Sequence, residues 1–413
     1  MLIKSYNCTY NGVVCKRLIF VLSKHSFYIR IPEDSMERDL EYFSSYFEVD
    51  LTQIKKNIEL VRKRIGEGHE IMPVLKGNCY GSGTVEVATA IEKDCNINIF
   101  GCAHVFEGIE MRKAGISCDI LLLSPPAQHG IKFAIENDLQ LPAFEELSIR
   151  RMAEEAKAQG KTAKVHIKVE TGMNRIGVKP GKDLEKIINL IKEVGNIEIV
   201  GIFTHFATSN ELYNDFTKEQ LRLFKASVLQ LEEMGVQPKY VHCCNSNAIV
   251  WLDDGYFTHV RTGSLYLGYS LIDEGDLHIG VKETASWRAF IVNIKEVFPG
   301  EQVGYNGAFV PTKPTKVATI SVGYADGLYR PLATTGGPVF VNGRRTKYLG
   351  LCMDQTFIDV TGIDCEIGDE VTLFGYDKVT GELLSAYELQ KHTDQTYVYQ
   401  FCSIGPRVKR IYK

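Results

Sequence analysis

The sequence predicts an α/β fold, a (β/α)8 TIM-type barrel followed by a mostly β C-terminal domain, and three observations support this prediction. Strand-like and helix-like segments alternate from residue 46 to about residue 269. The strand-like segments are rich in Val, Ile and Leu with little alternation, which is typical of strands buried on both faces. After about residue 279, short runs punctuated by Gly, Pro and Thr indicate a second, mostly β domain.

Nine segments have the character of strands, and they lie at 46–51, 70–78, 99–104, 119–125, 139–144, 163–170, 197–206, 239–246 and 258–268. Amphipathic helix patterns lie between them. In residues 52–65, for example, Ile54, Ile58, Val61 and Ile65 recur at steps of three and four. Repeated strand–helix units form a parallel sheet, and eight of them close a barrel. One strand is therefore spare, and we expect it to be the first or the last.

We expect three parts: a poorly ordered N-terminal extension at 1–35, the barrel at 46–275 and the β domain at 280–413. The extension has basic residues around a short apolar run at 18–22, as a signal peptide does. However, Lys24 and His25 follow the run where a small-residue cleavage site would stand. This pattern favours an extension over a secretion signal.

Composition argues against several functional classes. The chain has 413 residues, a formal net charge of −4 and no long basic run, which disfavours nucleic acid as the main partner. Its apolar runs are far shorter than the roughly 20 residues that a membrane helix needs. The 11 cysteines form no CxxC pair, so we expect neither a zinc site nor a disulfide framework, and we predict a cytoplasmic protein without a metal.

Cationic and hydrogen-bonding side chains recur at the C-terminal ends of the predicted strands, where the sites of TIM barrels form. They are Lys76, Asn78, Tyr80, Lys168, Arg175, His205, Asn245, Ser246, Arg261 and Ser264. Lys76 follows the apolar run 71–75, and desolvation there would lower its pKa and suit its amine to a Schiff base with an aldehyde. Gly263 and Ser264 offer backbone N–H groups that could bind a phosphate.

Each of these residues also has a structural interpretation. A lysine is usually a solvated surface charge, and a histidine on an apolar strand, such as His205, is often a satisfied core residue. The Arg261–Gly263 segment could simply end a strand. Tyr305 and Tyr324 flank turns and could serve packing alone.

An ordered set of motifs resembles the alanine racemases, a family of pyridoxal-phosphate enzymes. The motifs are VLKGNCYGSG (74–83), HIKVETGMNRIGV (166–178), THFA (204–207), NSNA (245–248), VRTG (260–263), VGYNG (303–307), GYADG (323–327) and CMDQ (352–355). Each is weak alone, but their order, and the step of nineteen residues from Tyr305 to Tyr324, makes the set specific. The resemblance covers residues 46–413.

The resemblance implies that pyridoxal 5'-phosphate is the cofactor and that Lys76 binds it covalently. It implies that Arg261 hydrogen-bonds the pyridine nitrogen. The other cofactor-binding residues implied in this way are Tyr80, His205, Ser246, Gly263, Ser264 and Tyr399. His205 would also hydrogen-bond Tyr305.

The resemblance also implies a substrate site and a partner. Arg175 would contact the substrate carboxylate, and Tyr324, Met353 and Asp354 would line the substrate entrance. Lys168 lies seven residues before Arg175, where many members of the family carry a carbamylated lysine. In the family, the second base and the Met–Asp pair come from the partner chain. The implied assembly is a head-to-tail homodimer with two shared sites that takes a small amino acid.

Racemisation removes a proton from one face of Cα and returns one to the other face, so it needs two bases. The resemblance assigns these roles to Lys76 and Tyr305. It predicts an amino-acid racemase, an isomerase that supplies D-alanine for the peptidoglycan of the cell wall.

Some positions depart from the family pattern. Glu170 stands in place of the usual aspartate, and Cys79 and Ser82 replace commoner residues of the lysine motif. In the TYVY segment, the Thr-x-x-Tyr spacing favours Tyr399 as the C-terminal phosphate contact, and Tyr397 stays open. Counting back from the RVKR segment at 407–410 instead gives Val398, which lies beside the substrate side chain in the family.

Four alternatives stay open, of which a barrel enzyme that does not use pyridoxal phosphate is the residual one. The substrate could be serine or a broader range of amino acids. A non-catalytic pyridoxal-phosphate-binding protein could use the same barrel, although it would need no second base such as Tyr305. A decarboxylase or aldolase could share the fold, but a decarboxylase would carry an acidic residue at the pyridine nitrogen, where this chain has Arg261.

Overall fold

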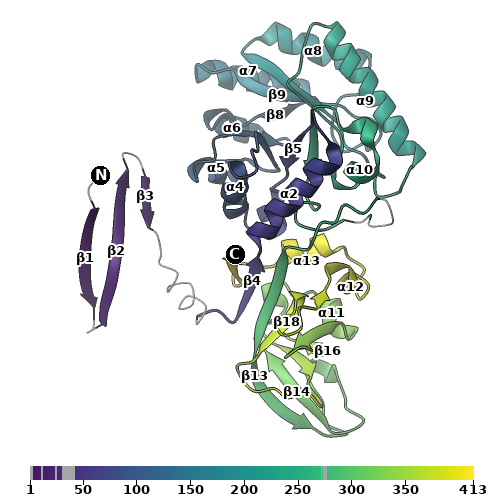
Figure 1. Ribbon diagram of the computed structural model, residues 1–413. Coiled ribbons are helices and arrows are strands. Elements are labelled where there is room, and N and C mark those ends of the chain that lie inside the picture. Colours follow the sequence, from purple (N-terminus) through teal and green to yellow (C-terminus); the bar gives the residue numbers. More distant parts are fainter. Residues whose placement is uncertain (1–2, 11–12, 24–25, 30–41, 271, 273–276) are drawn as a thin grey trace.

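A barrel and a mostly β domain make up the main body of the protein (Figure 1). The computed structural model describes residues 3–10, 13–23, 26–29, 42–270, 272 and 277–413. The barrel contains the central part of the chain, and the β domain contains its last third together with one early strand. The predicted fold class is confirmed.

Eight parallel strands line the barrel. They are β5 (Glu70–Pro73), β6 (Ile99–Cys102), β7 (Asp119–Leu122), β8 (Leu141–Ala143), β9 (Ala163–Lys168), β10 (Ile197–Phe203), β11 (Tyr240–His242) and β12 (His259–Thr262). Strand β12 pairs with β5, which joins the last strand to the first. Their buried, largely apolar residues explain the continuous hydrophobic runs in the sequence.

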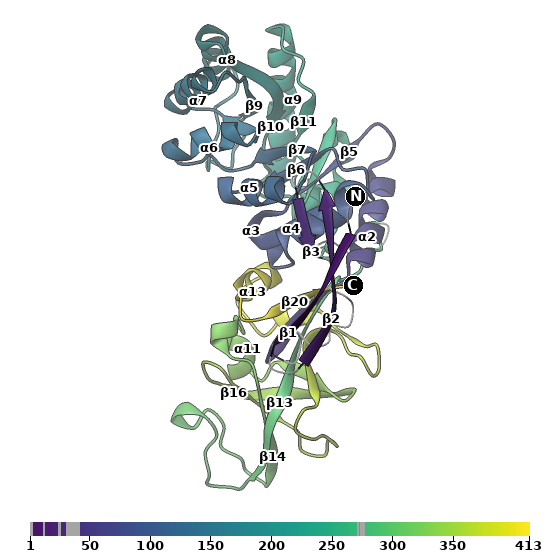
Figure 2. The same ribbon diagram turned by 90° about the vertical axis from the view of Figure 1, so that its left-hand side faces the viewer.

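Helices cover the outside of the barrel (Figures 1 and 2). They are α2 (Leu51–Ile65), α4 (Thr84–Glu92), α5 (Val105–Lys113), α6 (Ile131–Glu136), α7 (Glu146–Ala158), α8 (Lys182–Val194), α9 (Asp215–Glu233) and α10 (Ser246–Trp251). In α2, the side chain of Asp50 caps the first turn by accepting the Gln53 N–H at 2.7 Å. The predicted apolar stripe of α2 is buried against the barrel, as its period requires.

The spare strand is the first one. Strand β4 (Ser45–Val49) pairs with β13 (Ala285–Val297) antiparallel and with β20 (Lys409–Tyr412) parallel. It therefore belongs to the sheet of the β domain, and the chain enters the barrel only at α2. The two ends of the main body lie side by side in one sheet and hold the two domains together (Figure 1).

The β domain is built on a nine-stranded sheet with the order β19-β18-β15-β16-β17-β14-β13-β4-β20. The strands not yet named are β14 (Thr315–Ile320), β15 (Pro338–Val341), β16 (Arg344–Leu351), β17 (Thr356–Asp359), β18 (Glu370–Tyr376) and β19 (Leu383–Leu384). Strand β13 pairs with both β14 and β18, so the sheet curls around its own core.

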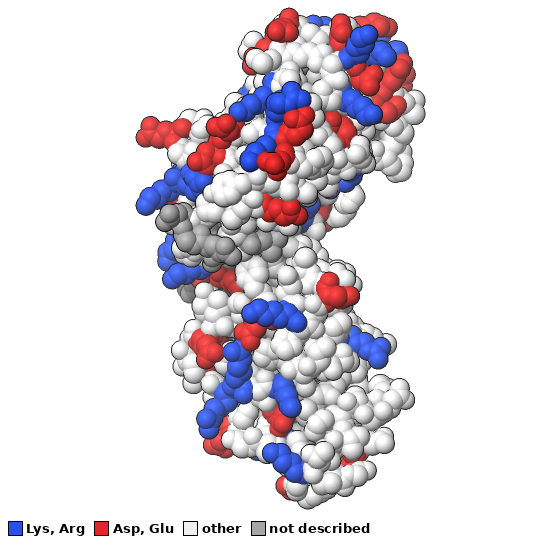
Figure 3. All heavy atoms as spheres, turned by 90° about the vertical axis from the view of Figure 1, so that its right-hand side faces the viewer, with Lys and Arg blue, Asp and Glu red and all other residues white. Residues whose placement is uncertain are grey.

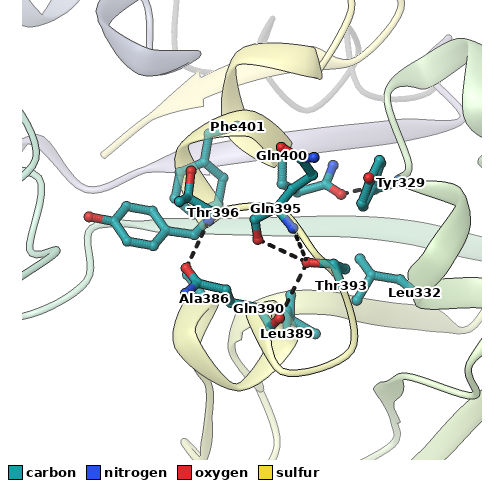
Figure 4. A pocket seen from close by; sticks show the side chains of 11 residues that line it. Tyr329, Leu332, Ala386, Leu389, Gln390, Thr393, Gln395, Thr396, Gln400 and Phe401 are labelled. Atoms are coloured by element: carbon teal, nitrogen blue, oxygen red, sulfur yellow. Dashed lines mark hydrogen bonds between the residues drawn. The ribbon is translucent and has the colours of Figure 1, made fainter. Parts of the chain in front are cut away.

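Three short helices lie between the sheet and the barrel: α11 (Arg330–Thr334), α12 (Ala386–Gln390) and α13 (Tyr397–Ser403). Figure 4 shows how side chains and backbone groups of this region bond to one another around a small pocket. Gln400 on α13 accepts the Tyr329 N–H at 3.1 Å, and Thr393 donates to the Gln395 carbonyl at 2.9 Å. The first of these bonds ties α13 to the segment that precedes α11.

An N-terminal sheet of three antiparallel strands precedes this body: β1 (Ile3–Tyr10), β2 (Val13–Ser23) and β3 (Ser26–Ile29). Residues 1–2, 11–12, 24–25 and 30–41 lie outside the described residues, so the expected poorly ordered extension at 1–35 stays a prediction.

Acidic and basic side chains are interspersed over the barrel on the face that Figure 3 shows. In the described part of the chain, no helix combines the length and the apolar character that crossing a membrane requires. The cytoplasmic location stays a prediction.

Candidate active site

A cavity of about 510 Å³ lies at the C-terminal ends of the barrel strands. Its lining includes four cationic side chains, those of Lys76, Lys168, Arg175 and Arg261, and no carboxylate. Such a wall favours an anionic ligand, and the volume suits a small cofactor together with a small substrate.

Lys76 opens a tight turn, α3 (Lys76–Tyr80), directly after β5. Residues 77 to 80 all have positive φ, between 52° and 63°. Because only glycine adopts this region without cost, Asn78, Cys79 and Tyr80 each store of the order of 1 kcal/mol of strain. Strain of this kind is concentrated at functional sites, and here it orients the lysine at the cavity wall.

The carboxylate of Glu107 holds this turn in place. Its Oε1 accepts the Gly77 N–H at 2.7 Å, and its Oε2 accepts the N–H groups of Ala103 and His104 at 2.8 and 3.0 Å. Glu107 is only 3% exposed, so three backbone donors satisfy a buried charge. Glu107 could not be predicted as a site residue, since nothing in its sequence context marks the turn that it holds.

The pKa of Lys76 is lowered from its ordinary value. Partial burial is the main cause, and the positive charges of Arg175 and Arg261 add to it. A lysine with a lowered pKa has more of the neutral amine, which is the nucleophilic and basic form.

Three backbone N–H groups converge on one hydroxyl beside Lys76. Gly263, Ser264 and Leu265 lie with their nitrogens 3.0, 3.2 and 3.4 Å from Ser246 Oγ. Successive N–H groups aimed at one point form an anion-binding nest. Asn245 positions Ser246, because its side chain caps α10 by accepting the Ala248 N–H at 3.0 Å.

The absence of a side chain at Gly263 opens this nest to Tyr80. A Cβ at position 263 would lie 2.2 Å from the Tyr80 hydroxyl oxygen, so only glycine lets that hydroxyl reach the nest. Backbone donors, two serine hydroxyls and a tyrosine hydroxyl are together suited to a phosphate. With a nucleophilic lysine beside them, these residues fit a phosphorylated aldehyde such as pyridoxal phosphate.

Arg261 lies in the cavity wall and is 3% exposed. Its NH2 donates to the Thr204 carbonyl at 2.8 Å and lies 3.1 Å from His205 Nδ1. A guanidinium only donates, so His205 must accept at Nδ1 and carry its proton on Nε2. Burial and the neighbouring Arg261 hold the pKa of His205 well below its ordinary value, so the ring is neutral.

Lys168 is almost fully buried, and its amine donates to the Val169 carbonyl at 2.8 Å. Burial lowers its pKa to about 7, although Glu170 partly opposes this. The neutral amine is therefore well populated at pH 7. Arg175 lies on the same cavity wall and is exposed to it.

The two candidate tyrosines of α13 lie in different surroundings. Tyr397 is 5% exposed, lines the cavity and hydrogen-bonds the Ser264 side chain. Tyr399 is 49% exposed, and its ring packs edge-on against Tyr329, 5.2 Å away. Tyr397 and Val398, rather than the expected Tyr399, therefore form this part of the cavity wall.

The remaining predicted residues lie on the β domain, away from this cavity. Tyr305 is 77% exposed in the loop between β13 and β14, whose far end points away from the barrel (Figure 1). Tyr324 and Met353 are about half exposed, at 51% and 50%. Asp354 accepts from Arg407 at 2.8 Å. Within one chain these side chains do not line the cavity that contains Lys76.

Comparisons with known proteins agree with this geometry. The family model described as "Alanine racemase, N-terminal domain" matches residues 49–271, and "Alanine racemase, C-terminal domain" matches residues 284–412. "Alanine racemase 2" of Caldanaerobacter subterraneus is 36% identical over 88% of this chain and 94% of its own length. The alanine racemase of Methanococcus maripaludis is 34% identical over 88% and 97%.

Solved structures give the same result. Alanine racemase from Clostridium difficile 630 superposes with a TM-score of 0.83 at 30% identity, over 90% of this chain and 96% of that one. The alanine racemase of Bacillus anthracis with bound L-Ala-P superposes with a TM-score of 0.82 at 30% identity, over 90% and 95%. Two adjoining family models and relatives of matching length establish that the chain belongs to the alanine racemase family.

Proposed function

We propose that this protein interconverts L- and D-alanine with pyridoxal phosphate, using Lys76 on one face of the substrate and Tyr305 of the partner subunit on the other. One observation carries the proposal: a lysine with a lowered pKa stands beside an anion-binding nest, in a cavity whose lining includes four cationic side chains and no carboxylate. A phosphate and a substrate carboxylate would balance these charges. In this role the enzyme would supply D-alanine to the cell wall.

Different residues of the cavity would bind different parts of the cofactor. Lys76 would bind its aldehyde carbon, and Ser246, Gly263, Ser264, Tyr80 and Tyr397 would surround its phosphate. The bound cofactor would supply an electron-withdrawing ring that makes the Cα proton of the substrate acidic.

Arg261 would face the ring nitrogen of the cofactor. Its pKa is lowered by burial, to about 10, which still leaves it charged and donating at pH 7. A group that donates and does not give up its proton would keep the ring nitrogen unprotonated. This restrains electron withdrawal and favours proton transfer at Cα over decarboxylation.

The second base would come from a second copy of the chain. Tyr305 is exposed and does not line the cavity of its own chain, which supports a head-to-tail homodimer with shared sites. His205 carries its proton on Nε2, since Nδ1 accepts from Arg261. That N–H would donate to the oxygen of the partner's Tyr305 and stabilise its deprotonated, basic form.

Two further residues, Arg175 and Lys168, would determine how charges are paired in the cavity. Arg175 would bind the carboxylate of the substrate. Lys168 has a partly neutral, buried amine in a cationic surrounding, and carbamylation would convert it into an anion that pairs with Arg175. Val398 on the cavity wall is a small apolar neighbour of the substrate side chain, so the assay should include serine as well as alanine.

The test is a mixing experiment with two inactive variants. Lys76→Ala should lose racemisation in both directions, and Tyr305→Phe should lose about 10²- to 10⁴-fold, the usual effect of removing a general acid or base. If the sites are shared, random pairing of the two chains forms mixed dimers in about half of all cases, each with one intact site. About a quarter of the activity of the unmodified enzyme should then return.

Tyr213→Phe serves as the matched control, because Tyr213 is also an exposed tyrosine but lies on the barrel, and it should keep full activity. Absence of recovery in the mixture, despite demonstrated subunit exchange, would contradict the shared site. No D-amino acid from either alanine or serine would contradict the proposed reaction.

A further inference from the structure

The interior of the barrel is unusual because several strands place polar side chains on its axis. TIM-barrel interiors are ordinarily filled by branched apolar residues. Here the series comprises Asp119 on β7, Gln140 just before β8, His166 on β9, Tyr240 and His242 on β11, and Arg261 on β12. All but Asp119 are at most 3% exposed. Burying a polar group costs free energy unless the group is hydrogen-bonded, so we expect each of these side chains to have a hydrogen-bond partner.

The first half of the series starts at the active site. Arg261 NH1 lies 2.8 Å from His242 Nδ1, and His242 Nε2 lies 2.9 Å from His166 Nδ1. His166 Nε2 then lies 2.6 Å from the side-chain oxygen of Gln140. Each ring nitrogen of the two histidines therefore has one partner.

The second half continues to the opposite end of the barrel. The Gln140 side chain hydrogen-bonds the Tyr240 hydroxyl, and that hydroxyl donates to Asp119 Oδ2. Asp119 is the first residue of β7, so it stands at the N-terminal end of the strands, whereas the active site lies at their C-terminal end. Lys239 pairs with the same Asp119 oxygen at 3.4 Å. Figure 2 labels β7, β9 and β11, three of the strands that carry this series.

The chemistry of the two ends fixes the direction of every bond between them. A guanidinium only donates, so His242 must accept at Nδ1, donate from Nε2 and leave His166 to donate from its own Nε2. Gln140 accepts that bond with its oxygen and donates with its amide nitrogen to Tyr240, which donates to Asp119. An ionised carboxylate only accepts, so the same direction follows from this end as well.

The protonation states agree with this direction. Burial lowers the pKa of His166 to about 3 and places the pKa of His242 well below its ordinary value, so both rings are neutral. Burial acts to raise the pKa of Asp119, but the bonds from Tyr240 and Lys239 outweigh it and lower the pKa, so Asp119 is ionised.

We propose that Asp119 is a positioning residue for racemisation, because it is the anionic end of a hydrogen-bond chain that crosses the barrel and holds His166, His242 and Arg261 in one protonation pattern. Arg261 in turn fixes the proton of His205 on Nε2. The inference rests on the proposed function only for the roles of Arg261 and His205 in the reaction. The series of hydrogen bonds from Asp119 to Arg261 is present without a cofactor.

The first test measures the tautomers of His166 and His242 in the protein without cofactor. Nitrogen-15 NMR of histidine-labelled protein should show His166 and His242 protonated on Nε2 alone. Tyr240→Phe removes the acceptor of the Gln140 amide, so that amide can turn over and present its nitrogen to His166 Nε2. The tautomer of His166 is then set from the Arg261 end alone, and a minor fraction protonated on Nδ1 should become detectable. Asp119→Ala should act in the same direction, whereas Asp119→Asn keeps an acceptor and should preserve the pattern.

The second test measures kcat and KM for alanine in the protein with its cofactor bound. The loss of one hydrogen bond typically changes an equilibrium or a rate by up to about tenfold, so kcat of Tyr240→Phe and Asp119→Ala should fall by up to about tenfold. KM for alanine should stay within about threefold, because none of these residues lines the cavity. Asp138→Asn is the matched control, since Asp138 borders the same hollow as Asp119 but pairs with Lys161.

Unchanged tautomers and a kcat within twofold in both variants would overturn the inference, as would an equal loss in Asp138→Asn. Asp119 lies at the rim of the barrel, so its variants decide the matter even where Tyr240→Phe does not fold. Fixed tautomers in a protein with no racemase activity would contradict the proposed function and leave the hydrogen-bond chain standing.

Discussion

Replacing Glu283 by glutamine should stabilise this protein in alkaline solution and leave its stability nearly unchanged in acid. Glu283 is 6% exposed just before β13. Its two oxygens share one bonding partner, the N–H of Ala386 at the start of α12, at 3.1 and 3.2 Å. The buried hydroxyl of nearby Tyr269 has no hydrogen-bond partner. Burial raises the pKa of Glu283 to about 8, and the bond from Ala386 opposes the rise only in part.

The sign and the size of the effect follow from proton linkage. The folded state keeps the proton up to about pH 8, while the unfolded chain loses it near its ordinary pKa of 4.5. Between these values the folded state binds more protons, so the free energy of unfolding falls as the pH rises. At about 1.36 kcal/mol for each pH unit, the total loss reaches about 5 kcal/mol by pH 8 and then stays constant.

Glutamine has nearly the same shape and does not ionise, so Glu283→Gln should escape this loss. Urea unfolding of the variant and of the unmodified protein should be compared at pH 5, 7 and 9. We expect similar stabilities at pH 5 and a variant more stable by several kcal/mol at pH 9. Other titrating groups are common to both proteins, and their effects cancel in the difference.

Glu232→Gln, on the exposed face of α9, is the control and should show no difference at any pH. A difference between the Glu283→Gln variant and the unmodified protein that does not change between pH 5 and pH 9 would refute the reasoning. It would mean that Glu283 ionises normally in the folded protein.

Three further predictions concern the cavity and the core. Gly263→Ala should weaken cofactor binding, because the new Cβ would lie 2.2 Å from the Tyr80 hydroxyl oxygen and displace it. The expected loss is about 10- to 100-fold, the value of one hydrogen bond to a charged group. Fluorescence titration of the apoprotein measures this affinity, and an unchanged value would show that Tyr80 does not bind the phosphate. The unmodified protein, equilibrated with labelled bicarbonate, should show a carbamate signal in carbon-13 NMR, since the pKa near 7 leaves Lys168 with a reactive amine. Lys168→Met should abolish this signal. A signal that persists would belong to another lysine. Phe224→Ala should reduce the free energy of unfolding by about 3–5 kcal/mol, because its ring is fully buried in the core, and a loss below 1 kcal/mol in urea unfolding would contradict that packing.

The local pattern of the sequence was sufficient to predict the barrel and most of its cavity. Buried parallel strands need continuous apolar runs, and their C-terminal ends converge at one end of the barrel whatever the details of the helices. Lys76, Arg261 and Ser246 could therefore be predicted to lie together, and they line one cavity. Their placement depends on strand order alone, which the repeated strand–helix units determine.

Other features depended on contacts between distant segments. The apolar pattern of residues 46–51 predicts a strand but does not determine its neighbour, and the structure pairs β4 with β13 and β20 rather than with the barrel. In α13, residues 397 to 399 point in three directions about 100° apart, so the packing of the helix decides that Tyr397 faces the cavity and Tyr399 the solvent.

The sequence alone determined the fold, the family resemblance and the lysine at the barrel mouth, because these follow from short-range patterns. Only the tertiary structure decided how charge is balanced inside. His166, His242 and Asp119 look like isolated polar residues in separate strands, and their partners come from other strands, far away in the chain. A hydrogen bond depends on the position and direction of both groups, and a sequence pattern specifies neither until the strands are closed into a barrel.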